Sequence, residues 1–526
     1  MDEVGARARR NTIGDALRRA GSRFRDRPAL RFGERDWSFA AIDRAADRVA
    51  RMLLDSGIRP GDRVVAFGKN SDAYFLLWLG CARAGFVHVP ANFALTAAEL
   101  DYILRQCGAS ALFAQPALRA VADAAGTALP ALRRGSLDAG EGPQDVLAAA
   151  LDPRWDLDAP IGEAVVDEDL VQLQYTSGTT GQPKGAMMTH RAILAEYASV
   201  TVELEMRRDD RALAALPLYH TAQMHCFTMP QMLNGAYTIL IEAPNPALVL
   251  ELIERERITS FFAPPTVWIA LLQHPEFDRR DLASLRNIYY GASIMPVPVL
   301  QELRRRLPGA RPFNCYGQSE IAPLATVLRP EEHDARPGSV GRAVLNVETR
   351  VVDAEMRDVA PGERGEVVHR SPQLLLGYWN MPEETARAFE GGWFHSGDVA
   401  TIDAEGYLAI VDRTKDLINT GGVLVASREV EEALFTHPAI AEVAVIAVPD
   451  PKWIEAVAAV VVLREGAPAE PEAALLAHAR EQLAAYKVPK CIILAESLPK
   501  NTAGKLLKRE LRAAYGGRAQ ALPGVA

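Results

Sequence analysis

The stretch YTSGTTGQPKG at residues 175–185 says most about how this chain folds. It follows the apolar-rich run Leu170–Gln174, which is typical of a strand that enters a turn. Glycines let backbone N–H groups approach an anion closely, hydroxyl side chains donate further hydrogen bonds, and Lys184 adds a mobile positive charge. A solvated linker would require neither an apolar strand before it nor Pro-Lys-Gly at its end. We therefore interpret the stretch as a phosphate-binding loop.

The spacing of this loop excludes a Walker P-loop. That motif requires Gly, four residues and then Gly-Lys-Ser/Thr. Lys184 is instead preceded by Pro183 and followed by Gly185. A serine hydrolase is not expected either, because no Gly-x-Ser-x-Gly sequence occurs.

Length and composition predict a large globular protein. A chain of 526 residues exceeds the usual size of a single core, so we expect about two to four structural units. Hydrophobic residues at 49% and charged residues at 24% are ordinary for a globular chain. A net charge of −9 argues against nucleic acid as the main partner, since phosphate backbones require a basic surface.

The cysteines and the apolar segments indicate a cytoplasmic protein. The five cysteines are scattered without metal-ligand spacing, so we expect reduced thiols in or near the core. The N-terminus lacks the apolar region of a signal peptide. The apolar segment Tyr74–Val89 is interrupted by Arg83 and is too short to span a bilayer, so it predicts a buried helix and turn.

The first half of the chain alternates between strand and helix patterns. The apolar patterns predict strands at Val64–Phe67 and Ala111–Phe113. Between them, a capping box at Thr96–Glu99 predicts the start of a helix. Such alternation predicts βαβ units and a largely parallel sheet in an α/β fold. The Gly- and Pro-rich stretch 138–164 has no clear periodicity and predicts a surface connection.

Several polar residues follow apolar segments farther along. The segment Ala212–His220 reads as a strand that ends at a histidine, which by itself is more often structural than catalytic. Strands are also expected at Ile258–Ala263 and Asn287–Tyr290, the second leading into the turn Gly291-Ala292-Ser293. In Asn314–Glu320, the aromatic, hydroxyl and carboxylate groups of Tyr316, Ser319 and Glu320 suit a purine, a phosphate and Mg²⁺, respectively.

Three later segments carry isolated charges whose simplest explanations are structural. Asp398 lies in a Gly-rich turn. Arg413 and Lys415 lie in a charged cluster that is typical of a solvated boundary. Lys505 lies on a glycine turn before a basic helix.

Together, these six motifs resemble in order those of the adenylate-forming superfamily of acyl-CoA synthetases, peptide-synthetase adenylation domains and beetle luciferases. The resemblance covers about residues 12–512. It implies a large N-terminal domain of sheets layered with helices, residues 1–413, and a small mobile α+β domain, residues 414–526, that rotates about Lys415.

The resemblance also assigns roles to residues. Catalysis would depend on Thr176, Lys184, His220, Glu320 and Lys505, with Glu320 as the metal ligand. Asp398 would bind the ribose hydroxyls and Arg413 the ribose or a phosphate. The remaining nucleotide and CoA contacts would come from Ser177, Gly178, Thr179, Thr180, Gly291, Ala292, Ser293, Tyr316, Gly317, Ser319, Gly421 and Gly422.

The residues expected around the acyl group are mostly apolar. The segment Ala222–Met232 contains no Arg or Lys that could pair with a second carboxylate, and no Asp follows His220 closely to hold an ammonium group. A hydrophobic monocarboxylic acid is therefore favoured, such as a fatty acid or another bulky lipid-like or terpenoid acid, with aryl acids as the second possibility. The expected pocket comprises His220, Phe227, Tyr289, Gly291, Gln318, Ile321 and Leu324.

The resemblance implies an AMP-forming acyl-CoA synthetase that uses ATP, Mg²⁺ and CoA, as a monomer or homodimer, without nucleic acid or integral membrane association. After the glycine pair 421–422, this chain has Val423–Ala426 where the family often has Glu-Asn and Pro. The acceptor therefore stays open between CoA and a carrier protein. The same motifs would also suit a ligase specialised for one half-reaction, or a silent relative that only binds a nucleotide or an acyl ligand.

Overall fold

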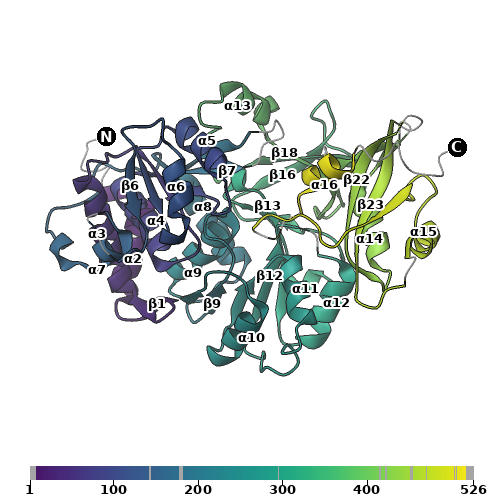
Figure 1. The fold of residues 1–526 in the computed structure, drawn as a ribbon, viewed down its shortest axis with the longest axis horizontal. Coiled ribbons are helices and arrows are strands. Elements are labelled where there is room, and N and C mark those ends of the chain that lie inside the picture. The colour runs from purple at the N-terminus through teal and green to yellow at the C-terminus, as the bar shows by residue number, and fades with distance from the viewer. Residues whose placement is uncertain are drawn as a thin grey trace.

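The computed structural model in Figure 1 describes residues 8–140, 142, 144–176, 182–293, 295–413, 416–420, 423–450, 454–468, 471–502, 504 and 506–516. The two strands that flank the predicted phosphate loop lie at one edge of a six-stranded sheet. Its strands are parallel except for the last pair, as the βαβ pattern predicts. In sheet order they are β6 (Arg133–Ser136), β5 (Ala111–Ala114), β3 (Arg63–Phe67), β4 (Val87–Ala91), β7 (Leu170–Thr176) and β8 (Lys184–Thr189).

A nine-stranded sheet forms the second layer. It is parallel from β13 to β1 and antiparallel at both ends. Its strands, in sheet order, are β15 (Arg342–Ala343), β14 (Leu324–Leu328), β13 (Arg311–Gly317), β12 (Asn287–Gly291), β11 (Ser260–Phe262), β9 (Arg211–Ala214), β10 (Tyr237–Leu240), β1 (Pro28–Phe32) and β2 (Arg35–Ser38).

Helix α4 (Asp72–Ala84) lies between these two sheets and contacts strands of both. All its residues are buried, which explains why its sequence is apolar on every face. Its two charges are paired within the fold: Arg83 with Asp43 and Asp47 of α3 (Phe39–Asp55), and Asp72 with Arg35 at 2.7 Å. Pairing is required because an isolated buried charge is costly.

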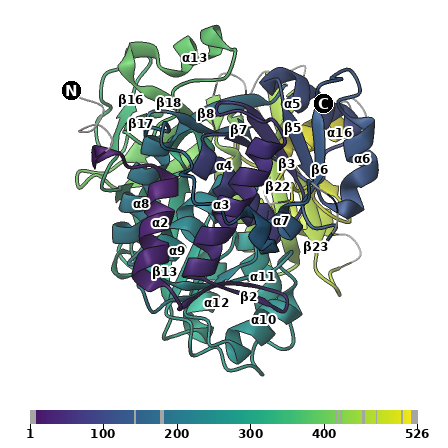
Figure 2. The same cartoon turned by 90° about the vertical axis from the view of Figure 1, so that its left-hand side faces the viewer.

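The other helices of these layers cover the sheets, and Figure 2 shows α2 beside α3. They are α2 (Ile13–Phe24), α5 (Ala97–Cys107), α6 (Arg119–Ala124), α7 (Val146–Leu151), α8 (His190–Glu203), α9 (Met229–Asn234), α10 (Pro246–Arg255), α11 (Pro265–Gln273) and α12 (Val297–Arg306).

Two expectations about local structure were wrong. The strand predicted to end at His220 stops at Ala214. Beyond it, Pro217 has no N–H, and the N–H groups of Leu216 and Leu218 donate to the side chains of Gln223 and Asn70 instead of to a strand. The stretch 138–164 is also not a simple connection, because it contains the two-turn helix α7 capped by Asp145.

Two smaller sheets follow along the chain. The first is antiparallel and consists of β16 (Glu348–Val352), β17 (Arg364–Arg370), β18 (Phe394–Ile402) and β19 (Leu408–Arg413), with α13 (Pro382–Ala388) in the connection from β17 to β18. The second lies at the right of Figure 1. It consists of β21 (Val423–Val425), β20 (Ile418–Thr420), β23 (Ile454–Leu463), β22 (Ile440–Asp450) and β24 (Cys491–Leu494), with α14 (Ser427–Phe435), α15 (Pro471–Gln482) and α16 (Lys508–Tyr515).

The last sheet and its helices have hydrophobic cores of their own. This gives a large N-terminal domain and a smaller C-terminal one, which confirms the expected α/β architecture. The boundary at residues 413 and 414 stays a prediction. All five cysteines are buried and free. Within the described ranges, no helix is long and apolar enough to cross a membrane.

Buried histidines predict that acid destabilises the fold. Burial lowers the pKa of His88 and His225 to about 3, and that of His190 and His369 to about 4. An unfolded histidine has a pKa of about 6.5, so below that pH the unfolded chain binds protons that the folded chain does not. The free energy of unfolding should therefore fall below about pH 6.5, by up to about 1.4 kcal/mol per histidine and pH unit.

Urea unfolding between about pH 7.5 and 5.5 measures this effect. The His88 ring packs against Tyr74 and Trp78, and its nitrogens have no hydrogen-bond partner. His88→Leu should therefore reduce the pH dependence by about one proton. An unchanged pH dependence in this variant would contradict the assignment of the effect to buried neutral histidines.

Candidate active site

The phosphate loop connects two antiparallel strands at the edge of the six-stranded sheet. Strand β7 ends at Thr176, β8 begins at Lys184, and these two residues are cross-strand partners. Both therefore lie at the neck of the loop. The predicted ligands Ser177, Gly178, Thr179 and Thr180 lie outside the described residues.

Glu320 lies directly beside this neck, although it follows β13 of the other large sheet. The Thr176 hydroxyl donates to Glu320 Oε1 at 2.9 Å, and the Tyr378 hydroxyl donates to the same oxygen at 3.3 Å. The carbonyl oxygen of Glu320 accepts from Leu375 N at 2.9 Å. The structure therefore places the predicted metal ligand at the entrance to the predicted phosphate loop.

Lys184 is held by residues that the sequence did not suggest. Its ammonium group pairs with Glu384, which lowers the pKa of that carboxyl, and lies 5.3 Å from the centre of the Tyr378 ring. Burial, followed by the charge of Glu320, raises the pKa of Tyr378. The aromatic pair Tyr378-Trp379 after a glycine was the only local signal for this segment.

The segment that carries Tyr378 extends the sheet beside β8. Leu376 N donates to Met187 O, Met187 N to Gly377 O, and Trp379 N to Gly185 O, at 2.8 to 2.9 Å. Backbone hydrogen bonds thus fix Tyr378 next to the phosphate loop, and α13 brings Glu384 to Lys184.

Tyr316, Asp398 and Arg413 form a second group. The Tyr316 hydroxyl donates to Asp398 Oδ2 at 2.7 Å, and Arg413 Nε lies 3.3 Å from Asp398 Oδ1. Burial and the Asp398 carboxylate raise the pKa of Tyr316. These residues come from β13, β18 and β19, so three sequence motifs meet at one carboxylate.

His220 lies in the turn before the π-helical segment η3 (Ala222–Thr228). Its Nδ1 accepts from Ala222 N at 3.3 Å, which orients the ring. The next residue, Thr221, exchanges a hydrogen bond of 2.9 Å with Ser319 of the metal-ligand turn. A small cavity beside His220 is lined by Leu216, Pro217, His220, Ala222, Gln223, Phe262, Pro264 and Ala292.

The predicted glycines are required by close backbone packing. A Cβ at Gly291 would lie 2.2 Å from Cys315 O, and one at Gly317 would lie 1.9 Å from Pro323 O. Any larger residue would therefore separate the strands that present Ala292, Ser293 and Ser319. Ala292 itself has a φ of 63°, an unusual conformation for a residue with a side chain.

The predicted acyl-pocket residues are mostly buried. The ring of Phe227 stacks on Phe262 at 4.2 Å and also contacts Tyr289 at 5.1 Å. The Tyr289 hydroxyl is turned into the core, where it donates to Leu204 O at 2.9 Å. Ile321 and Leu324 are buried, whereas the buried Gln318 Nε2 has no hydrogen-bond partner.

The other predicted residues belong to the C-terminal part of the chain. Lys415, Gly421, Gly422 and Lys505 lie outside the described residues. The residue before Lys505 is described: Gly504 O accepts from Thr266 Oγ1 of the large domain at 3.4 Å.

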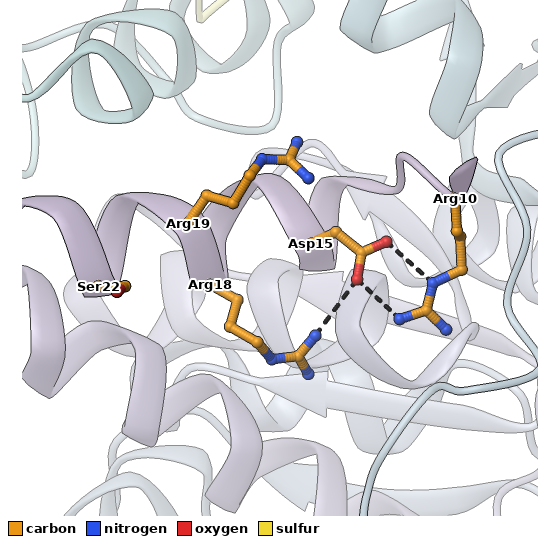
Figure 3. Close-up of a pocket in the computed structure, with 5 residues that line it drawn as sticks. All are labelled: Arg10, Asp15, Arg18, Arg19 and Ser22. Atoms are coloured by element: carbon orange, nitrogen blue, oxygen red, sulfur yellow. Dashed lines mark hydrogen bonds and ion pairs between the residues drawn. The ribbon is translucent and has the colours of Figure 1, made fainter. Parts of the chain in front are cut away.

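A second hollow, shown in Figure 3, lies along α2 and contains no predicted site residue. Its Asp15 accepts from Arg10 at 2.7 Å and pairs with Arg18 at 3.2 Å. The same carboxylate completes the N-terminal cap of α2, so this charge cluster has a structural explanation. The lining residues are Arg10, Asp15, Arg18, Arg19 and Ser22.

The described residues contain no group of three or more His, Cys, Asp or Glu side chains that could hold a metal by themselves. A single carboxylate such as Glu320 still suits Mg²⁺, because this ion commonly binds one or two carboxylates together with substrate phosphates.

Comparisons with known proteins agree with this arrangement. The AMP-binding enzyme model matches residues 17–379, and the model of the AMP-binding enzyme C-terminal domain matches residues 429–505. The chain is 39% identical to a feruloyl-CoA synthase of an Amycolatopsis species over 489 residues, 93% of this chain and 96% of that protein. It is 35% identical to a long-chain-fatty-acid–CoA ligase of Mycobacterium tuberculosis, covering 91% and 93% of the two chains.

Among solved structures, ATP-bound MatB from Rhodopseudomonas palustris superposes with a TM-score of 0.87 at 30% identity, covering 97% of this chain and all of that one. The chain therefore belongs to the AMP-binding enzyme family, and within it to the adenylate-forming acyl-CoA synthetases, which are AMP-forming acid–thiol ligases.

Proposed function

We propose that this protein activates a hydrophobic carboxylic acid with Mg·ATP and then transfers the acyl group to CoA. The observation that carries the proposal is the hydrogen bond from Thr176 to Glu320, because a carboxylate beside the end of β7 is suited to hold Mg²⁺ next to phosphates bound by the proposed loop. Asp398 lies on the strand next to Arg413 and is contacted by Tyr316 of the nine-stranded sheet, and its carboxylate is offered to a ribose.

In the first step, a carboxylate oxygen of the acid attacks the α-phosphorus of ATP. The bond from that phosphorus to the bridging oxygen breaks, and pyrophosphate leaves with the electron pair. Mg²⁺ bound at Glu320 would neutralise part of the phosphate charge. The chain's own contribution is positioning by Thr176 and the phosphate loop and a positive charge from Lys505.

In the second step, the CoA thiol loses its proton and its sulfur attacks the acyl carbon. The bond to the adenylate oxygen breaks, so the products are the thioester and AMP. The small domain would rotate about Lys415 between the two steps, withdrawing Lys505 and presenting Gly421 and Gly422 to the pantetheine arm.

The lining residues support a hydrophobic acid. The cavity beside His220 is lined mostly by apolar side chains, among them Leu216, Pro217 and Phe262. Of the predicted pocket residues only His220 lines it, whereas Phe227, Ile321 and Leu324 are buried in the core. Relatives named for a long-chain fatty acid and for ferulic acid match with similar coverage. An aryl acid is the second candidate, because the ring of Phe262, which stacks on the buried Phe227, lines the cavity at His220.

Mass spectrometry of the products tests the reaction and its substrate class. The purified protein is incubated with ATP, Mg²⁺, CoA and fatty, terpenoid and aryl acids, and in parallel with CoA and preformed acyl-adenylates. We expect acyl-CoA and AMP from at least one hydrophobic acid. Thioester from the adenylates alone would identify a half-reaction enzyme. Product from neither arm would overturn the proposal and favour a binding protein.

Lys505→Ala should separate the two half-reactions. We expect acyl-adenylate formation to fall about 10²- to 10³-fold, because a positive charge at the α-phosphate is lost. Thioester formation from supplied acyl-adenylate should be largely retained. Pyrophosphate release and thioester yield measure the two steps. Arg509→Ala, which removes an exposed cation on α16, is the control. Equal loss of both activities would contradict this division of labour.

Asp398→Asn should weaken the binding of ATP. The amide would accept less strongly from the ribose hydroxyls and would lose its attraction to Arg413, so we expect the KM for ATP to rise about 10-fold. Steady-state kinetics at varied ATP concentration measure this change. Asp358→Asn, which alters an exposed ion pair with Arg350, should leave KM unchanged. The ribose role would be wrong if the KM of Asp398→Asn stayed at the wild-type value.

A further inference from the structure

Just before the last helix, the described residues 499–502, 504, 506 and 507 belong to a turn that backbone hydrogen bonds close, called here the 499–507 turn. Leu507 N donates to Pro499 O at 2.9 Å, Gly504 N donates to Asn501 O at 2.9 Å, and Lys500 and Leu506 form an antiparallel bridge. Lys500 also pairs with Glu442 of β22 at 2.6 Å. The backbone hydrogen bonds and the ion pair with Glu442 therefore fix the shape of this turn on the small domain.

The tip of the turn is hydrogen-bonded to the large domain. Thr502 Oγ1 donates to Asn92 Oδ1 at 3.3 Å and exchanges a hydrogen bond with the Tyr219 hydroxyl. Because the single proton of Thr502 goes to Asn92, the Tyr219 hydroxyl is the donor of the second bond. The result is a chain of two hydrogen bonds from Tyr219 through Thr502 to Asn92.

The large-domain side of this contact is fixed in place. Tyr219 is 8% exposed, and its ring meets that of Phe93 edge-on at 6.0 Å. Asn92 Oδ1 also accepts from Ala94 N at 3.0 Å, which orients the amide. Tyr219 directly precedes His220, so the contact lies next to the candidate acid site.

A second contact excludes any larger residue at Gly504. Its φ is +80°, and a Cβ there would lie 2.6 Å from Thr266 Oγ1 and 3.4 Å from Pro264. Together with the Thr266 hydrogen bond to Gly504 O, this shows a close fit between the turn and the first turn of α11.

We propose that Thr502, Tyr219 and Asn92 are positioning residues that hold the turn 499–507 on the large domain during acyl-adenylate formation and release it for thioester formation. This proposal rests on the two-step function proposed above. Neutral hydrogen bonds of ordinary strength each change an equilibrium by about 2- to 12-fold. Such bonds favour the docked arrangement and still break in every catalytic cycle.

Tyr219→Phe and Thr502→Val test the proposal, because each removes one hydroxyl and preserves the shape of the side chain. We expect each to slow acyl-adenylate formation about 3- to 10-fold, measured by pyrophosphate release. Thioester formation from supplied acyl-adenylate should be no slower than in the wild type. Thr502→Ser, which keeps the hydroxyl, should restore adenylation.

The double variant Tyr219→Phe with Thr502→Val tests whether the two hydroxyls act through their mutual hydrogen bond. If the two hydroxyls act through one contact, the double variant should be slowed by less than the product of the two single effects. Matched controls are Tyr237→Phe, which loses a bond to Asp36 inside the large domain, and Thr436→Val, which loses one inside the small domain. Both should adenylate at the wild-type rate.

Three results would overturn the positioning role: equal slowing of both half-reactions, unchanged adenylation in both single variants, or fully multiplicative effects in the double variant. Failure of the two-step function is distinguishable, because the wild-type protein would then form no thioester from acids or from supplied adenylates.

Discussion

The hydrogen bond between Thr176 and Glu320 joins the two large sheets at the point where the chemistry is expected. Thr176 ends β7 of the six-stranded sheet, and Glu320 follows β13 of the nine-stranded one. Strand ends of parallel sheets gather loops at one edge, which is where α/β proteins bind their ligands. The buried helix α4 also joins these two sheets, because it contacts strands of both.

The surroundings of this bond are built largely from the connection between β17 and β18. Its residues 376–379 pair with β8, and its helix α13 supplies Glu384 to Lys184. With its ammonium group already paired, Lys184 links the phosphate loop to α13 as well as carrying charge. Lys184, at the end of the predicted phosphate loop, is therefore supported by a residue that follows it by 200 positions.

The small domain reaches the candidate site through polar contacts. Thr502 and Gly504 contact the loops that follow β4 and β9 and the start of α11 by hydrogen bonds and a close glycine contact, and of the two cores of the small domain only the edge residue Phe435 also packs against the core of the nine-stranded sheet. Domains that meet through such contacts can separate at low cost. This agrees with a mechanism in which one domain serves two successive steps.

The sequence by itself determined the α/β class, the parallel sheets and the order of the motifs, because strand and helix periodicity, capping boxes and glycine spacing are local properties. It also proposed Glu320, Asp398 and Tyr316 as candidate site residues, because their chemical groups limit what they can bind. Only the tertiary structure decided which residues meet: Thr176 with Glu320 across 144 positions, and Tyr219 with Thr502 across 283. The tertiary structure also decided that β9 ends at Ala214. The N–H of Leu218, which the local pattern assigned to a strand, donates instead to Asn70, 148 positions away. Such pairings depend on how distant segments pack, and local periodicity carries no record of that packing.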